Sequence, residues 1–263
     1  MIPTANSSAP RRIVVGDVHG HYDTLLRLLA LIGPGAQDEV YFVGDLIDRG
    51  AGSAQVVELV RREGYHTLIG NHEQLLIQAM ADYLEFSESI EYHPWFYSGG
   101  METLGSYGRD LDKLEADMRW LYEQPFYYDL GDFWLVHAGV DPDRSVSEQS
   151  AHDLCWIRGD FHTIDRPYFA DKTIVTGHTI TFTLPNIAPG MIAQGPGWLD
   201  IDTGAYHPRS GWLTALDLDQ QMVYQANAYS SATWISPLAD RVQSYKSPVS
   251  KSPVSSQTHA MCQ

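Results

Sequence analysis

The sequence predicts an α/β fold in which a mainly parallel sheet is followed by a mixed or second sheet. Over the first third of the chain, short apolar runs of strand length alternate with segments of helical periodicity, as in parallel strands joined by helices. The later part contains more strand-like runs and fewer helical ones, which favours a mixed or second sheet. No linker divides residues 11–240, so we expect a single domain there.

Strands are expected where short runs consist mainly of apolar residues, because such runs are typical of buried strands. In chain order these runs are Ile13–Val15, Val40–Val43, Thr67–Ile69, Phe133–Val136, Thr173–Val175, Trp198–Ile201, Trp212–Leu218 and Met222–Tyr224. Helices are expected where apolar residues recur at every third or fourth position. These segments are Asp23–Ile32, Ser53–Arg62, His72–Leu84 and Leu111–Gln124.

Composition limits the partners and the location. The formal net charge of −16 disfavours long nucleic acids, whose binding depends largely on neutralising phosphates with Lys and Arg, but it allows a small phosphorylated group. No apolar run reaches the roughly 18 residues of a membrane-spanning helix, and the first residues lack the apolar core of a secretory signal. We therefore expect no membrane partner and a cytoplasmic location.

The cysteines limit the kind of metal site, and the two ends of the chain limit the part that is expected to fold. Only two cysteines are present, Cys155 and Cys262, which excludes a disulfide framework and a cysteine-rich zinc site. Any metal is then held by oxygen and nitrogen atoms. Residues 1–10 are expected to form a flexible leader, and residues 244–263, which are rich in Ser and Pro, a disordered tail.

Five of the predicted strands end in a similar pattern, a glycine close to Asp, Asn or His. The blocks are GDVHG at residues 16–20, GDLIDRG at 44–50, GNHE at 70–73, HAG at 137–139 and GHT at 177–179. Ligands bind at the carboxyl ends of the strands in an open α/β sheet, so these turns should converge. Convergence would bring together Asp17, His19, Asp45, Asn71, His137 and His178.

This set of side chains suits two neighbouring divalent cations. A carboxylate between two ions can bridge them, imidazoles supply neutral nitrogen ligands, and an Asn carbonyl adds a ligand without further charge. Each residue alone has a plainer explanation: Asp17 as a turn or cap residue, and His137 or His178 as a hydrogen-bonded core histidine. The combination of five ordered blocks favours the metal site.

The five blocks, in this order, resemble the phosphoprotein phosphatase type of metallophosphoesterase, which is related to the symmetrical diadenosine tetraphosphatases. The resemblance covers residues 13–226 and extends to the WIR segment at 156–158 and the IDTG segment at 201–204. It implies a calcineurin-like β-sandwich of two mixed sheets flanked by helices, in a single domain.

The resemblance implies a ligand set for each of two metal ions, with Asp45 as the bridge. The sets are Asp17, His19 and Asp45 for one ion, and Asp45, Asn71, His137 and His178 for the other. In the family a solvent hydroxide lies between the metals, which acidify this nucleophile and stabilise an in-line displacement. We expect Mn²⁺, with Fe, Zn or Co as alternatives that intrinsic affinity does not exclude.

Four catalytic roles are also implied by the resemblance. Asp48 orients His72, which protonates the leaving oxygen as a general acid. Arg49 and Arg158 bind the phosphate oxygens, because planar guanidinium groups match pairs of these oxygens. Arg158 has a plainer alternative, a surface ion pair with Asp160.

An aromatic segment lies between the GNHE and HAG blocks. It contains Tyr92, Trp95, Phe96 and Tyr97. The segment is either a packed cap over the core or a wall of the cleft that stacks a nucleobase or shapes a peptide groove. The resemblance further places Tyr206 near the substrate, although a simple link between two strands also explains its turn.

Three functions follow from these predictions. The first is a dinuclear metal-dependent phosphomonoesterase, a serine/threonine protein phosphatase acting on phosphoproteins or phosphopeptides, with phosphotyrosine as a further substrate. The alternative is a symmetrical dinucleoside polyphosphate (diadenosine tetraphosphate) hydrolase on the same metal core, against which Asp48 argues mildly. The third, a non-catalytic scaffold, would be expected to lack a ligand or the acid, and none is missing.

Overall fold

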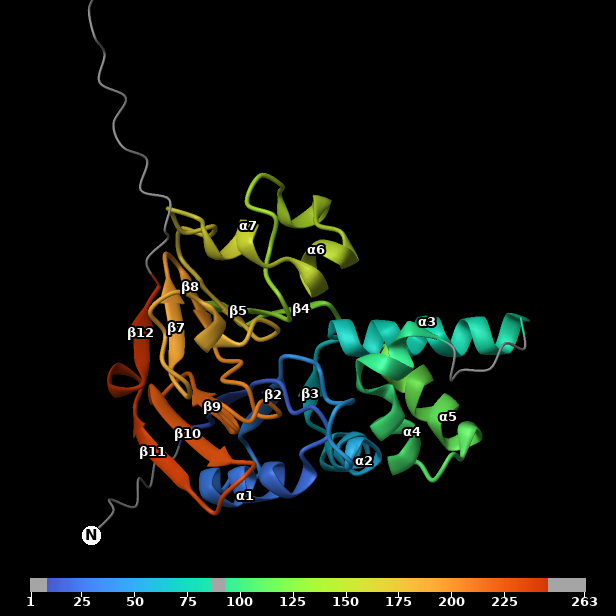
Figure 1. Ribbon diagram of the computed structural model, residues 1–263. Helices are drawn as coiled ribbons and strands as arrows, with labels where there is room; N and C mark the ends of the chain where they lie inside the picture. Colours follow the sequence, from blue (N-terminus) through green and yellow to red (C-terminus); the bar gives the residue numbers. More distant parts are fainter. Residues whose placement is uncertain (1–8, 87–92, 246–263) are drawn as a thin grey trace, which may run out of the picture.

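The computed structural model describes residues 9–86 and 93–245. Most of the predicted leader and tail, together with Tyr92, lies outside these residues. Within the described part, the chain forms two six-stranded sheets with helices on both outer sides (Figure 1).

The first sheet combines a parallel half with an antiparallel half. Its strand order is β11-β10-β9-β1-β2-β3, in which β1, β2 and β3 are parallel and the other neighbours are antiparallel. The strands are β1 (Arg12–Val15), β2 (Glu39–Phe42), β3 (His66–Thr67), β9 (Trp212–Asp217), β10 (Met222–Asn227) and β11 (Thr233–Pro237). The parallel half therefore directs the turns after β1, β2 and β3 to one edge.

The second sheet has the strand order β12-β7-β8-β6-β5-β4. Its strands are β4 (Tyr127–Asp129), β5 (Phe133–Val136), β6 (Thr173–Thr176), β7 (Ile192–Gly195), β8 (Trp198–Asp200) and β12 (Val242–Ser244). Strands β5, β6 and β8 are parallel, so the HAG and GHT turns also leave one edge together. The pairing of β12 with β7 carries this sheet past residue 240, to Ser244.

Helices cover the outer face of each sheet and one end of the molecule (Figure 1). Those beside the first sheet are α1 (Tyr22–Ile32) and α2 (Ser53–Glu63), and those beside the second are α6 (Ala151–Trp156) and α7 (Gly159–His162). The end is formed by α3 (Asn71–Phe86), α4 (Met101–Ser106) and α5 (Leu111–Tyr122).

The alternation of side chains along the strands explains this layering. Ile13 and Val15 of β1 belong to the core that includes residues of α1 and α2, whereas Val14 between them packs in the core between the two sheets. On the far face of the second sheet, Trp198 packs in one core with Phe161 of α7. Each sheet is thus buried on both faces, which is why its central strands read as continuous apolar runs.

The predicted α/β fold with two mixed sheets is confirmed. Every predicted strand and helix overlaps an element of the structure. Strands β4, β7, β11 and β12 and the short helices α4, α6 and α7 were not predicted. The edge strand β11 is largely exposed and β12 is only partly buried, so their sequences, TWISP and VQS, carry no apolar run.

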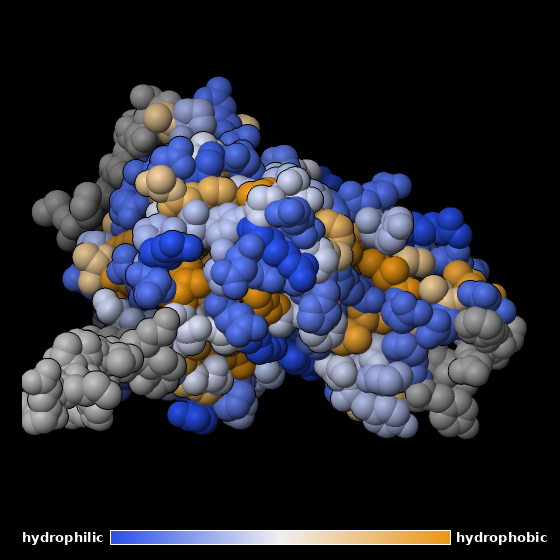
Figure 2. Space-filling view, turned by 90° about the horizontal axis from the view of Figure 1, so that it is seen from above, coloured by the Kyte–Doolittle hydropathy of each residue, from blue (hydrophilic) through white to orange (hydrophobic). Residues whose placement is uncertain are grey.

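Polar side chains dominate much of the surface in Figure 2, with apolar patches that include the end formed by α3, α4 and α5. Leu84 and Met101 are exposed in this region. Among the described residues, no helix has both the length and the apolar character needed to span a membrane.

Candidate functional site

The turns after the parallel strands form the floor of the site. The backbone N–H groups of Val18 and His19 donate to the carbonyl of Asp45 at 3.1 and 2.9 Å, which joins the turn after β1 to the turn after β2. Several non-glycine residues here have positive φ: His19 (46°), Asp45 (50°), Asp48 (72°), Arg49 (70°) and His178 (69°). Such backbone persists only where the surroundings fix it, and it is common at functional sites.

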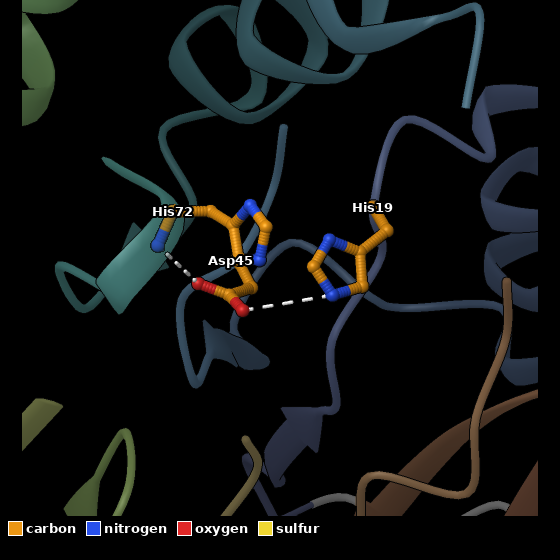
Figure 3. A group of neighbouring side chains, drawn as sticks. All are labelled: His19, Asp45 and His72. Atoms are coloured by element: carbon orange, nitrogen blue, oxygen red, sulfur yellow. Dashed lines mark hydrogen bonds and ion pairs between the residues drawn. The ribbon is translucent and has the colours of Figure 1, made fainter. Parts of the chain in front are cut away.

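Asp45 is the central carboxylate (Figure 3). Its Oδ2 lies 3.5 Å from Nε2 of His19, and its Oδ1 lies 3.4 Å from Nε2 of His137. Oδ1 also accepts the backbone N–H of His72 at 3.0 Å. Burial opposes ionisation, but the neighbouring histidines lower the pKa of Asp45 below its ordinary value. The two oxygens face different histidines, as a bridging carboxylate requires.

Each of the three predicted histidine ligands is oriented by a backbone carbonyl. The distances are 3.0 Å from Nδ1 of His19 to Ile47, 2.8 Å from Nδ1 of His137 to Val43, and 3.3 Å from Nε2 of His178 to Trp156. Because one nitrogen of each ring donates to a carbonyl, the other nitrogen keeps its lone pair. Metal-binding histidines are typically fixed in this way.

The ligand atoms gather in two overlapping groups. Atoms within 4.8 Å of one another come from Asp45, His137 and His178, and from His19, Asp45 and His72. The predicted ligand Asn71 joins the first group, because its Oδ1 lies 3.0 Å from Nε2 of His137 and 2.7 Å from Nδ1 of His178. The second group contains His72, which was predicted as the general acid rather than as a ligand.

Asp17 lies beside these groups. Both of its carboxylate oxygens accept the backbone N–H of His178, at 3.2 and 3.0 Å. A Cβ atom at Gly177 would overlap Oδ1 of Asp17, so glycine is needed for this close approach. Burial, followed by the charges of Asp202 and Asp45, raises the pKa of Asp17 well above its ordinary value.

These residues fit a pair of divalent cations. Several carboxylates are buried together here, which is unfavourable unless positive charge compensates them. Neutral imidazole nitrogens and an amide oxygen complete the donor set. One contact must change, because the guanidinium of Arg49 lies against Nε2 of His19 and has to leave this nitrogen when His19 binds a cation.

A pocket of about 200 Å³ opens beside the donor set. It is lined by Asp45, Arg49, Asn71, His72, Arg158, His178, Ile180, Thr183 and Tyr206. The guanidinium of Arg49 lies 4.0 Å from the ring centroid of Tyr206. Nη1 of Arg158 donates to the carbonyl of His178 and to the hydroxyl of Thr179, both at 3.2 Å. The structure therefore brings both predicted phosphate-binding arginines, and Tyr206, to one pocket.

His72 and Asp48 form a buried pair. Nδ1 of His72 lies 2.6 Å from Oδ2 of Asp48. Asp48 is fully buried and also accepts hydrogen bonds from the indole of Trp95 and the hydroxyl of Thr103. Burial alone would lower the pKa of His72, but Asp45 and Asp48 raise it above its ordinary value. Because Nδ1 is engaged, Nε2 is the nitrogen left to act on a molecule in the pocket.

Three residues support the site through contacts that the sequence did not predict. Trp95 is fully buried against Asp48 and so belongs to a packed cap, whereas Tyr97 in the same segment is 77% exposed. No sequence pattern around Thr103 predicts its hydrogen bond to Asp48. Glu73 closes the GNHE block, and this position was the one indication of its role.

We expect Glu73→Gln to destabilise the fold around the site. The Glu73 carboxylate accepts the backbone N–H groups of Asp45, Leu46 and Gly70 at 2.9, 2.8 and 2.8 Å. Glutamine keeps one acceptor oxygen and turns an N–H group toward one of these donors. The free energy of unfolding, measured by urea denaturation, should fall by about 1 to 3 kcal/mol. The exposed Glu85→Gln is the matched control, and equal stability of the two variants would contradict this role.

Comparisons with known proteins agree with this geometry. The family described as calcineurin-like phosphoesterase matches residues 10–195. A symmetrical bis(5'-nucleosyl)-tetraphosphatase of Pasteurella multocida is 29% identical over 160 residues, which cover 57% of this chain and 54% of that protein. The asymmetrical bis(5'-nucleosyl)-tetraphosphatase PrpE of Oceanobacillus iheyensis is 27% identical over 225 residues, which cover 73% of this chain and 82% of that protein.

The fold is also found among solved structures. A crystal structure provisionally named a diadenosine tetraphosphatase superposes with a TM-score of 0.59 at 19% identity, covering 88% of this chain and 95% of that chain. The chain spans about half the length of the symmetrical curated relatives it matches, 54% and 47% for two of them. The family match and the shared architecture confirm the predicted resemblance: the chain belongs to the calcineurin-like phosphoesterase family.

Proposed function

We propose that the protein is a metal-dependent hydrolase of the phosphoesterase family whose substrate is a dinucleoside polyphosphate, in which it cleaves a phosphoanhydride bond. The main support is that relatives named tetraphosphatases align with more than half of the chain, which carries a buried donor set beside a pocket with two arginines. Family membership supports the enzyme class. The names of the relatives support the substrate class.

We propose two sets of metal ligands that share Asp45. The sets are Asp17, His19 and Asp45, and Asp45, Asn71, His137 and His178. When bound, such a pair of ions acidifies a water molecule and neutralises charge on the phosphoryl group. The nitrogen and oxygen ligands fit Mn²⁺, Fe, Zn or Co, and Mn²⁺ is the ion to test first.

The side chains that line the pocket supply the remaining functions. Arg49 and Arg158 bind phosphate oxygens, because each guanidinium offers paired donors. His72 donates the proton on Nε2 to the leaving oxygen, and Asp48 holds the ring through Nδ1. Tyr206, which packs on Arg49, limits the directions in which this arginine can point.

The test compares two substrates with one Mn²⁺-loaded preparation of the full chain. Diadenosine tetraphosphate and a phosphothreonine peptide are supplied in turn, and products are separated by chromatography, with Asp45→Asn as the blank. Two ADP molecules indicate symmetrical cleavage, and ATP with AMP indicates asymmetrical cleavage. A higher kcat/KM for the dinucleotide supports the proposal, whereas hydrolysis of neither substrate removes it.

A serine/threonine protein phosphatase is the second candidate, and the His72–Asp48 pair favours it. An alkoxide is a poor leaving group, so a phosphoserine or phosphothreonine ester gains more from a well-held general acid than a phosphoanhydride does. Asp48 is fully buried and fixes His72 at 2.6 Å. A higher kcat/KM for the phosphopeptide in the same comparison would transfer the assignment to this candidate.

Arg49→Ala should weaken phosphate binding. Arg49 lines the pocket and offers donors that alanine lacks, and the loss of a charged hydrogen bond corresponds to about a 10- to 100-fold change in affinity. The inhibition constant of inorganic phosphate, measured in competition with substrate, should rise by this factor. Arg62→Ala, at an exposed arginine on α2, is the control. A normal inhibition constant in Arg49→Ala would exclude its role.

A further inference from the structure

Arg158 precedes a very short helix, and its carbonyl accepts the backbone N–H groups of Phe161 and His162 at 3.1 and 3.0 Å. It lies between α6 and α7, it is exposed, and its backbone has φ −133° and ψ −95°. The helix that follows, α7, has four residues. One turn of helix is not stable by itself, so tertiary contacts must hold this segment and the arginine that begins it.

His162, the last residue of α7, supplies such a contact. Its Nδ1 lies 2.9 Å from the carbonyl oxygen of Arg158, and its Nε2 lies 3.1 Å from Oδ2 of Asp200. The side chain of His162 is 1% exposed and that of Asp200 is fully buried. The imidazole therefore joins the backbone of Arg158 to the end of β8.

The far end of this connection is close to the predicted metal ligands. Asp200 of β8 is in register with Thr176 of β6, the strand that leads into His178. The guanidinium of Arg158 donates to the carbonyl of that same His178 at 3.2 Å. Arg158 is thus held at two points, through its side chain and through its backbone, relative to one edge of the second sheet.

We propose that His162 is a positioning residue that keeps Arg158 aimed at the phosphate, by linking the Arg158 carbonyl to Asp200. The inference rests on the proposed function, in which Arg158 binds a phosphate oxygen. His162 belongs to none of the five sequence blocks. Its role depends on a contact with Asp200, 38 residues later in the chain.

A plainer explanation is that His162 only fills the core. Phe161, fully buried beside Trp198, already anchors α7 by apolar packing. A polar pair is a costly way to fill the same space, because burial raises the pKa of Asp200 to about 6 although the hydrogen bond from His162 acts against this. The pair is better explained by the fixed geometry that its two hydrogen bonds give.

A double-mutant cycle separates these explanations. The full chain, loaded with Mn²⁺, is prepared as wild type, His162→Phe, Arg158→Ala and the double variant, and binding of inorganic phosphate is measured by calorimetry. His162→Phe should weaken phosphate binding about fivefold to tenfold in the wild-type background. It should have no further effect in the Arg158→Ala background, because the group that it positions is gone.

Matched variants keep the test decisive. If His162→Phe does not fold, His162→Gln replaces it, since Gln can still reach Asp200 but lacks an N–H group at the position of Nδ1. The exposed His152→Phe on α6 is the control and should leave phosphate affinity unchanged. If His162→Phe weakens phosphate binding equally in both backgrounds, or in neither, the positioning role alone is overturned. Absence of phosphate binding by the wild type would instead overturn the proposed function and this inference with it.

Discussion

In Asp45→Asn we expect both metal ions to be lost together and kcat/KM to fall by about 10²-fold or more. The two oxygens of Asp45 face His19 and His137 at 3.5 and 3.4 Å, one toward each predicted ion. Asparagine has no negative charge and one oxygen, so neither ion keeps its shared ligand. Elemental analysis of the purified variant measures the metal content per chain directly.

The control for Asp45→Asn is the same exchange at an exposed site. Asp112→Asn on α5 should retain its metal and its activity. Loss of one ion with full retention of the other would show that Asp45 serves a single ion. Retention of both ions would contradict the bridging assignment, whatever the activity of the variant.

The sequence predicted the sheets well because burial on both faces leaves a plain signal. Val14, for instance, lies in the layer between the sheets, within a run, Ile13–Val15, that is apolar at every position. Exposed edge strands lack this signal. Trp234 of β11 is 48% exposed and pairs with Gln225 of β10, a partnership that only the assembled sheet supplies.

The sequence predicted those site residues that stand in a recognisable local pattern. Asp45, Asn71 and His178 each stand beside a glycine at the end of a predicted strand, and the structure brings them together. Supporting residues have no such pattern. Thr103 reaches Asp48 across 55 residues of chain, so its role follows from packing and not from sequence spacing.

Histidines of the site are predicted to have two roles, metal ligand and general acid, and substitutions should distinguish them. In His19 and His137, Nδ1 donates to a backbone carbonyl, so Nε2, which faces Asp45, keeps its lone pair. This arrangement favours metal binding. His72 instead places Nδ1 on a carboxylate, which favours proton transfer. Yet His72 also lies within 4.8 Å of His19 and Asp45, so geometry alone permits either role. A substitution at His72 distinguishes them.

His72→Asn should lower kcat by about 10²- to 10⁴-fold while metal content stays unchanged. Asparagine cannot donate a proton to the leaving oxygen, but it removes no predicted metal ligand. The loss should be smaller for p-nitrophenyl phosphate, whose good leaving group needs little protonation, than for a phosphothreonine peptide. Asp48→Asn should also reduce kcat, because it weakens the 2.6 Å contact that holds His72.

The control is His152→Asn, at an exposed histidine on α6, which should leave kcat and metal content unchanged. A fall in metal content in His72→Asn would assign His72 to the metal site. Unchanged kcat toward the phosphopeptide would remove His72 from proton transfer altogether. A general acid predicts three results together: full metal content, a low kcat, and a loss of kcat that grows with the basicity of the leaving group. The loss of a metal ligand or of packing would lower kcat by the same factor for every leaving group.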